Sequence, residues 1–365
     1  MTTPADRVRD LIALSGVSQG EFASGVGLDP SKMSKSLAGA RRFSSLDLAR
    51  IAERSTVTVD WLLTGEETPL ATAARAASGS SAERALSEAG RLVDLRASAT
   101  RLGYPQSWRS VPARSTRGRA VDQGADLAAE ALARLESLSL DPVALDLATV
   151  LEAGFGVDVC ITSLGEGFDG LAASTEDAKL ILAALTPVAF RQRFTIAHEL
   201  GHLLAGDDQG VHLDKDISSP QGRRDQTEIR ANAFAAALLM PESRLRGAVG
   251  PGFDEGAFAT LSLRLMVSPP ALAYRLENLS LIDAMTRDVW KSLSASQATR
   301  RAGAANSMAA ATAYSTEPRR PGLLARDLFA AYLDERTTLR PYANLLGVDT
   351  ATLRDGLERS DEIGT

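Results

Sequence analysis

The sequence has very little cysteine, histidine and aromatic side chain. Its 365 residues include one cysteine and three histidines, and aromatic residues make up 5% of the chain. The single cysteine, Cys160, excludes a disulfide within the chain and is typical of a reducing cytoplasm. It stands in an apolar stretch, so we expect a buried thiol. Because no hydrophobic run could span a bilayer and no signal-peptide core is present, we expect a cytoplasmic protein without a membrane partner.

An excess of positive charge is also missing. The 40 basic and 46 acidic residues leave a net charge of −6, which excludes a general polyanion binder. Any surface for nucleic acid must therefore be local. The length is too great for one small core and predicts two or three domains.

Composition and hydrophobic periodicity divide the chain into regions of different character. In chain order we expect an all-helical unit at 1–65, an Ala-, Ser- and Arg-rich helical linker with a mobile loop at 66–120, a mixed domain at 121–290, a second linker at 291–322 and a small helical region at 323–365. Short β-rich pieces are expected at 157–164, 170–174 and 179–185. The predicted fold class is therefore mainly α with a small β-sheet (α+β).

Two of the three histidines belong to one motif, His198-Glu199-Leu200-Gly201-His202. Side chains four residues apart share one face of a helix, so His198 and His202 can bind a single metal ion. Glu199 points toward the same side, near a bound water, which is the HExxH pattern of zinc hydrolases. The alternative is a pair of hydrogen-bonded histidines on a buried helix. We expect this helix to run from about residue 190 to 205.

A zinc hydrolase site needs a third protein ligand. No histidine stands at the short downstream spacing of a metzincin, so we expect a carboxylate, and Glu228 on a following helix is the best candidate. Asn232 lies one turn after Glu228, where its amide could orient a ligand. Rival carboxylates, all aspartates between the two helices, are Asp207, Asp208, Asp214, Asp216 and Asp225.

The motif predicts hydrolysis by an activated water. The metal would lower the pKa of that water, and Glu199 would accept its proton and pass it to the leaving amine. A strand edge before the metal helix could hold an extended peptide, and Gly201 would let neighbouring backbone approach. The donor to the oxyanion stays open among His212, Arg193, Tyr274 and backbone amides of the 170–183 strands.

Two stretches closely resemble the ImmA/IrrE family of metallopeptidases: Arg191 to Leu204 (RQRFTIAHELGHLL) and Glu228 to Ala235 (EIRANAFA). The resemblance covers roughly 125–285. It implies a zincin-like α+β domain in which His198, His202 and Glu228 bind the metal, usually zinc with manganese possible, and Glu199 is the catalytic base. It also implies cleavage of a helix-turn-helix repressor that controls stress or mobile-element genes.

Residues 5–65 resemble an XRE (Cro/repressor-type) helix-turn-helix domain, through Ser18-Gln19, Glu21-Phe22-Ala23 and Val26-Gly27-Leu28. The resemblance places the third helix, from Pro30, in the major groove of double-stranded DNA, with the protein as a homodimer on its operator. The stretch 30–46 contains no acid. Expected DNA-facing residues are Gln19, Ser31, Lys32, Ser34, Lys35, Arg41 and Arg42, whereas Met33 and Leu37 should face the core. The alternative is a helical bundle that binds protein.

Together these patterns predict a DNA-binding regulator joined to a zinc-dependent endopeptidase. The expected substrate is a partner repressor or an antitoxin-like protein. A different hypothesis keeps the same domains: a transcription factor without proteolysis, in which the peptidase-like domain senses a signal or mediates dimerisation.

Overall fold

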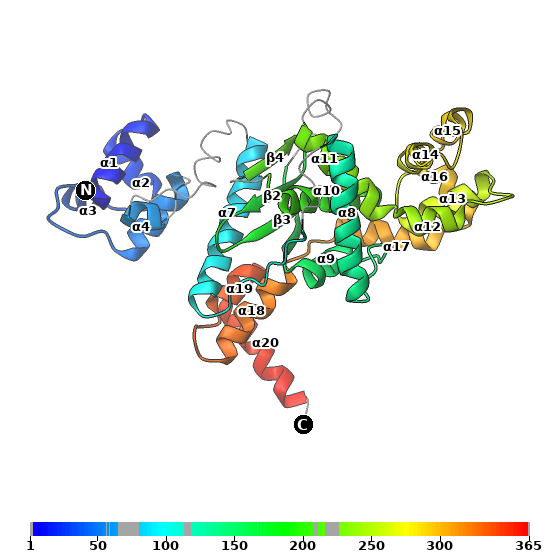
Figure 1. Ribbon diagram of the computed structural model, residues 1–365. Coiled ribbons are helices and arrows are strands. Elements are labelled where there is room, and N and C mark those ends of the chain that lie inside the picture. Colours follow the sequence, from blue (N-terminus) through cyan, green and yellow to red (C-terminus); the bar gives the residue numbers. More distant parts are fainter. Residues whose placement is uncertain are drawn as a thin grey trace. The chain divides into compact units, whose positions relative to one another are not determined.

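The protein is described by a computed structural model that covers residues 3–55, 57, 59–64, 80–112, 118–165, 167–207, 211–215 and 226–363. The chain forms two compact units, Met1–Ser78 and Gly79–Thr365 (Figure 1). The first unit is helical and the second contains helices and a small sheet, so the predicted mainly helical α+β class is confirmed.

The N-terminal unit follows the capping signals of its sequence. Its helices are α1 (Pro4–Ser15), α2 (Gln19–Gly25), α3 (Pro30–Leu37), α4 (Ser45–Ser55) and α5 (Val59–Thr64). Ser18 and Glu21 form a capping box on α2, and the Asp29 side chain accepts from the first backbone amides of α3. Phe22, Met33 and Ile51 are buried in the core between the helices.

The sheet contains β1 (Asp158–Thr162), β2 (Phe168–Ser174), β3 (Lys179–Ala184) and β4 (Val211–Lys215). Among the described strands the order is β1-β3-β2-β4, with β1 parallel to β3 and the other pairs antiparallel. The first three strands were predicted, but β4 was missed because its five residues carry two charges and a histidine. The strand directly before the metal helix, β3, lies inside the sheet, so the expected strand edge at that position is wrong.

Helices of the second unit pack on the sheet and on one another. Helix α10 (Ala189–Ala205) contacts β2 and β3, and α11 (Gln226–Leu239) lies between α10 and α8 (Ala120–Ser137). The shared core also includes α9 (Leu147–Phe155), with Phe155 and Phe234 fully buried. The predicted metal helix and the predicted helix of Glu228 are therefore packed neighbours.

A second group of helices continues the unit: α12 (Glu242–Ala248), α13 (Glu255–Leu265), α14 (Pro269–Asn278), α15 (Ala284–Trp290), α16 (Ala295–Ala302) and α17 (Ala305–Thr316). The Trp290 ring stacks on Phe258 with centroids 4.7 Å apart. The linker expected at 291–322 differs from the structure, because α16 packs on α13 and α17 on α10. Their alanines Ala298 and Ala311 are buried, and small side chains permit this close packing.

The expected linker at 66–120 also differs, because α7 (Ser80–Arg101) is a packed helix of the second unit (Figure 1). It contacts α18 (Gly322–Leu333) and α19 (Arg340–Leu346), which precede α20 (Thr350–Ile363). Its buried Arg96 pairs with Asp158 of β1 at 2.7 Å and with Asp327 of α18 at 2.6 Å.

The described part of the expected mobile loop is held in place as well. The backbone amide of Arg109 donates to the carbonyl of Phe155 at 2.7 Å, and the Gln106 side chain bonds both backbone groups of Lys179. Residues 113–117 of that loop lie outside the described residues.

Candidate metal centre

The HExxH motif lies in the C-terminal half of α10. This helix ends where Gly206 takes a left-handed conformation with φ 70°, so the predicted helix is confirmed. His198, Glu199 and His202 are fully buried. The two imidazole rings lie on the same face of the helix, with their centroids 4.7 Å apart. The motif is thus enclosed beneath the surface with both rings turned to one point.

The third side chain at that point is Glu228, in the first turn of α11. The Nε2 atoms of His198 and His202 are 3.0 Å apart, and the Glu228 carboxylate oxygens lie 3.5 Å from the first and 3.3 Å from the second. Ligands about 2.0–2.1 Å from a tetrahedral zinc ion lie roughly 3.3 Å from one another. The donor set and its spacing therefore fit a zinc-sized cation.

Close helix packing brings Glu228 to the histidines. A Cβ added at Gly201 of α10 would lie 2.9 Å from Cδ1 of Phe234 in α11. The glycine was expected to admit neighbouring backbone, but it admits this aromatic ring. On the other side, a Cβ added at Gly124 of α8 would lie 2.3 Å from the carbonyl oxygen of Arg230. Gly201 and Gly124 therefore determine how closely α11 packs against α10 and α8.

Asp207 contacts the other nitrogen of the second histidine. Its Oδ2 lies 3.3 Å from Nδ1 of His202, and its Oδ1 pairs with Arg230 of α11. A carboxylate on the second ring nitrogen orients a metal-binding imidazole and makes it a better ligand. Asp207 was expected only as a rival ligand, so sequence reasoning missed this role. Of the other rivals, Asp208, Asp216 and Asp225 lie outside the described residues, as does the side chain of Asp214.

These carboxylates make the centre favourable for positive charge. Burial lowers the pKa of His202, but hydrogen bonds with Asp207 and Glu228 outweigh it and raise that pKa to about 9. The same negative groups would attract a divalent cation bound at Nε2. The donors and the electrostatics of the centre therefore agree.

The side chain of Glu199 extends from α10 toward strand β2. A Cβ added at Gly170 of β2 would lie 3.1 Å from Oε1 of Glu199 and 2.4 Å from Cγ2 of Thr195. Only a residue without a side chain allows the strand to pass this close to the carboxylate. Gly170 is thus part of the wall around the expected catalytic base.

Two of the expected oxyanion donors, Arg193 and Tyr274, make other contacts in the structure. Arg193 is excluded because its buried guanidinium donates to the carbonyls of Pro142 at 2.8 Å, Ala144 at 2.6 Å and Leu145 at 3.2 Å. Tyr274 lies at the surface, with the cations of Arg287 and Lys291 over its ring.

The remaining expected donors stay open. The backbone of His212 pairs with Ala172 in the sheet, but its side chain lies outside the description. Backbone amides of β2 and β3 therefore remain candidates. Asn232 is half-buried on α11, and its orienting role stays a prediction.

The N-terminal unit presents most of the residues that we expected to face DNA. Met33 and Leu37 are buried, as predicted. The expected DNA-facing residues that are exposed are Gln19, Ser31, Lys32, Ser34, Lys35 and Arg42. Arg41 differs, because it pairs with Asp47 at 2.8 Å and donates to the hydroxyl of Ser36 at 3.2 Å. Asp47 lies just beyond the stretch 30–46, so counting charges within that stretch alone overstated the positive charge of this surface.

Comparison with known proteins agrees with this centre. Residues 153–277 match the IrrE N-terminal-like domain family. The radiation response metalloprotease IrrE of Deinococcus radiodurans is 34% identical over 159 residues, which are 41% of this chain and 47% of that protein. The chain therefore matches about half the length of this curated relative. The matched region contains His198, Glu199, His202 and Glu228 and supports a metallopeptidase domain.

Among the described residues, every helix is too short or too polar to cross a bilayer.

Proposed function

We propose that the protein is a metal-dependent endopeptidase joined to a DNA-binding unit, and that it cleaves a partner repressor or an antitoxin-like protein in the cytoplasm. One observation carries the proposal: two imidazole nitrogens and a carboxylate lie 3.0 to 3.5 Å apart, beside the buried Glu199. The matched domain and the metalloprotease relative support the same chemistry.

His198, His202 and Glu228 would hold Zn²⁺, or Mn²⁺ as the second choice. When bound, such an ion acidifies a water molecule and polarises a carbonyl group. Glu199 performs the proton transfer: its carboxylate accepts a proton from the attacking water and donates it to the nitrogen of the leaving amine. Asp207 keeps the His202 ring turned so that Nε2 faces the other ligands.

The substrate would bind as an extended peptide along the sheet. In the described sheet β4 is an outer strand, and its neighbour β2 carries Gly170 beside the Glu199 carboxylate. A peptide that adds to β4 gains backbone hydrogen bonds without a defined sequence, while side-chain pockets select the cleavage point. This arrangement suits cleavage of an exposed segment in a folded partner.

The catalytic proposal is tested by Glu199→Gln, which removes the base but no proposed ligand. We expect the variant to bind zinc with the affinity of the wild type and to lose cleavage of a helix-turn-helix protein encoded beside its gene by roughly 10²–10⁴-fold. His198→Ala serves as the comparison, since it should lose both metal and cleavage. Undiminished cleavage by zinc-loaded Glu199→Gln would refute the assignment.

The N-terminal unit would bind operator DNA as a homodimer through α3. Lys32, Lys35 and Arg42 are exposed, and Asp29 caps the start of the helix. Each phosphate contact that is removed should reduce the slope of log affinity against log salt by about one. We expect this for Lys32→Ala and Lys35→Ala. Arg41→Ala should instead lower stability, because its guanidinium pairs with Asp47.

A transcription factor without proteolysis is the second candidate. The division into two compact units favours it, because a DNA-binding unit with its own core does not need peptide hydrolysis in the other unit. Reporter repression separates the two functions. Repression that persists in both Glu199→Gln and His198→Ala supports this candidate, whereas a partner repressor that is cut in the wild type and stays intact in Glu199→Gln supports the protease.

A further inference from the structure

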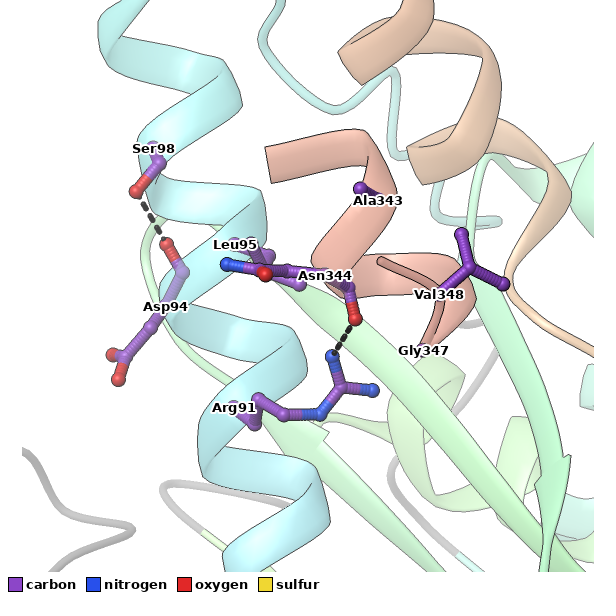
Figure 2. A pocket seen from close by; sticks show the side chains of 8 residues that line it. All are labelled: Arg91, Asp94, Leu95, Ser98, Ala343, Asn344, Gly347 and Val348. Carbon is purple, nitrogen blue, oxygen red and sulfur yellow. Dashed lines mark hydrogen bonds between the residues drawn. The ribbon is translucent and has the colours of Figure 1, made fainter. Parts of the chain in front are cut away.

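Helices α7 and α19 line two adjoining hollows that contain no residue of the metal centre. One has a volume of about 480 Å³ and lies between Arg91 and Leu95 of α7 and Asn344 of α19 (Figure 2). The other, which we call the arginine pocket, has a volume of about 430 Å³ and is lined by Arg84, Glu88, Arg91, Thr162, Ser163 and Arg320 among others. Its size is in the range of small-molecule sites.

The arginine pocket is strongly positive for its size. Arg84, Arg91 and Arg320 face a single acid, Glu88, so two positive charges are in excess. The arginines come from distant parts of the chain, since Arg84 and Arg91 belong to α7 whereas Arg320 precedes α18. Glu88 offsets only one of the three guanidinium charges, so an anion in the hollow would reduce the repulsion that remains.

Glu88 holds two of these arginines in position. Its carboxylate accepts from Nε and Nη2 of Arg91 at 2.8 and 2.7 Å and lies 3.4 Å from Nη1 of Arg320. Arg91 also donates from Nη1 to the carbonyl of Asn344 at 3.2 Å (Figure 2). These bonds use three of its five N–H donors. The guanidinium group of Arg91 is therefore held in place before any ligand arrives, while two of its donors remain for an anion.

Neutral hydrogen-bonding groups complete the lining. Ser87 lies on α7 beside Glu88, Thr162 is the last residue of β1, and Ser163 follows it. Hydroxyl groups and arginines are the usual partners of phosphate oxygens. The pocket thus combines positive charge, arginine guanidinium groups and hydroxyl groups.

We propose that the arginine pocket binds the phosphate group of a small phosphorylated molecule. A hollow of about 430 Å³ fits a small ligand, whereas a nucleic acid is bound along an extended basic stripe. Asp94 in the adjoining hollow further disfavours a long polyanion. A bound phosphate would neutralise the arginine pocket and join α7 to the segment before α18.

Binding can be measured with the full-length protein by calorimetry and thermal shift. The probes are inorganic phosphate, AMP as a simple phosphomonoester, and adenosine as its uncharged match. We expect AMP or phosphate to bind saturably and raise Tm, and adenosine to do neither. Equal affinity for both anions would identify free phosphate as the source, whereas tighter AMP would identify a phosphorylated metabolite.

Variants locate the site. Arg84→Gln and Arg320→Gln should each weaken phosphate or AMP about tenfold, as expected for a lost hydrogen bond to a charged group. Arg354→Gln, at an exposed position on α20, makes the same charge change outside the pocket and should bind like the wild type. Arg84 is exposed, so its variant keeps the test valid even if Arg320→Gln fails to fold.

Three results would overturn the proposal. The first is no saturable binding of either anion. The second is binding that Arg84→Gln leaves unchanged. The third is duplex DNA that competes with the anion in the wild type and loses affinity in Arg84→Gln, because the surface would then belong to a nucleic acid.

Discussion

Asp207 lies 3.3 Å from Nδ1 of His202, across the ring from the nitrogen that faces His198 and Glu228. Its other carboxylate oxygen pairs with Arg230 on the helix that carries Glu228. Arg230 in turn donates from Nη1 to the side-chain oxygen of Gln123 in α8 at 3.2 Å. One chain of polar contacts therefore joins a proposed ligand on α10 to the helix of another proposed ligand.

Asp207→Ala should weaken zinc binding by about 10–100-fold, because the ring of His202 loses its orienting partner. Asp207→Asn, which keeps a hydrogen-bond acceptor but not the charge, should fall between this variant and the wild type. Affinity is measured by competition with a chelator. Asp122→Ala is the control, since Asp122 pairs with Arg119 at the surface. Equal zinc affinity in Asp207→Ala and the control would contradict the role of Asp207.

Gly124→Ala should destabilise the second unit and weaken metal binding together. The new Cβ would meet the Arg230 carbonyl at 2.3 Å and the Phe234 amide nitrogen at 2.9 Å, and backbone cannot move as cheaply as a side chain. We expect a loss of about 1–3 kcal/mol in the free energy of unfolding, measured in urea. Moving α11 also moves Glu228.

The matched control is Gly90→Ala on α7, where a Cβ would meet no atom within 4 Å. This variant should gain about 0.5–1 kcal/mol, because alanine loses less backbone freedom than glycine in a helix. A Gly124→Ala protein as stable as Gly90→Ala would show that α8 and α11 are packed less closely than described.

Gly170→Ala should affect hydrolysis more than metal binding. Its Cβ would lie 2.8 Å from the Leu182 carbonyl and 3.1 Å from Oε1 of Glu199, whereas Gly170 is on a strand that carries none of the proposed ligands. We expect kcat to fall at least tenfold with near-normal zinc affinity, since small displacements of a catalytic group are costly. Loss of zinc in proportion to kcat would instead indicate general damage to the unit.

Local patterns predicted the local parts of this protein. Helical spacing was enough to place His198 and His202 on one face of a helix, and Pro30 was correctly expected to begin the third helix. The contact of Asp207 with His202 was not predicted, because Asp207 follows Gly206, where the chain leaves the helix and the four-residue periodicity no longer applies.

Long-range partners explain the larger errors. Arg96 made α7 look like a polar linker, yet it is buried because Asp158 and Asp327 lie 62 and 231 residues further along the chain. Arg41, which we expected to face DNA, has an ion-pair partner for a similar reason, since Asp47 lies just after the stretch 30–46.

Asp6 offers a pH test of the N-terminal unit. A hydrogen bond from the backbone amide of Thr3, at 2.8 Å, and further bonds from the Thr3 hydroxyl and Arg9 lower the pKa of Asp6 from 3.8 to about 2. Because the folded pKa lies below the unfolded one, the stabilisation is present above pH 3.8 and is lost as the pH falls through about 2. A carboxyl titration by NMR should show this midpoint. Thr3→Ala should raise the midpoint, and an unchanged value would contradict the capping box.

Arg96→Met should be the most destabilising of these changes. It leaves the carboxylates of Asp158 and Asp327 buried without their shared cation, and breaking such a cluster typically costs about 3–5 kcal/mol. The triple variant with Asp158→Asn and Asp327→Asn should recover much of the loss, since no buried charge is then left alone. Urea unfolding measures both.

The deficit of Arg96→Met should also depend on pH in a defined direction. Burial, only partly offset by Arg96, raises the pKa of Asp158 above its unfolded value, and removal of Arg96 raises it further. A carboxyl with a raised folded pKa contributes most stability when it is protonated and loses that contribution as the pH rises. Arg96→Met should therefore differ least from the wild type in acid and most at neutral pH. A deficit that is constant with pH would mean that the lost stability comes from packing of the arginine stem and not from unpaired buried charge.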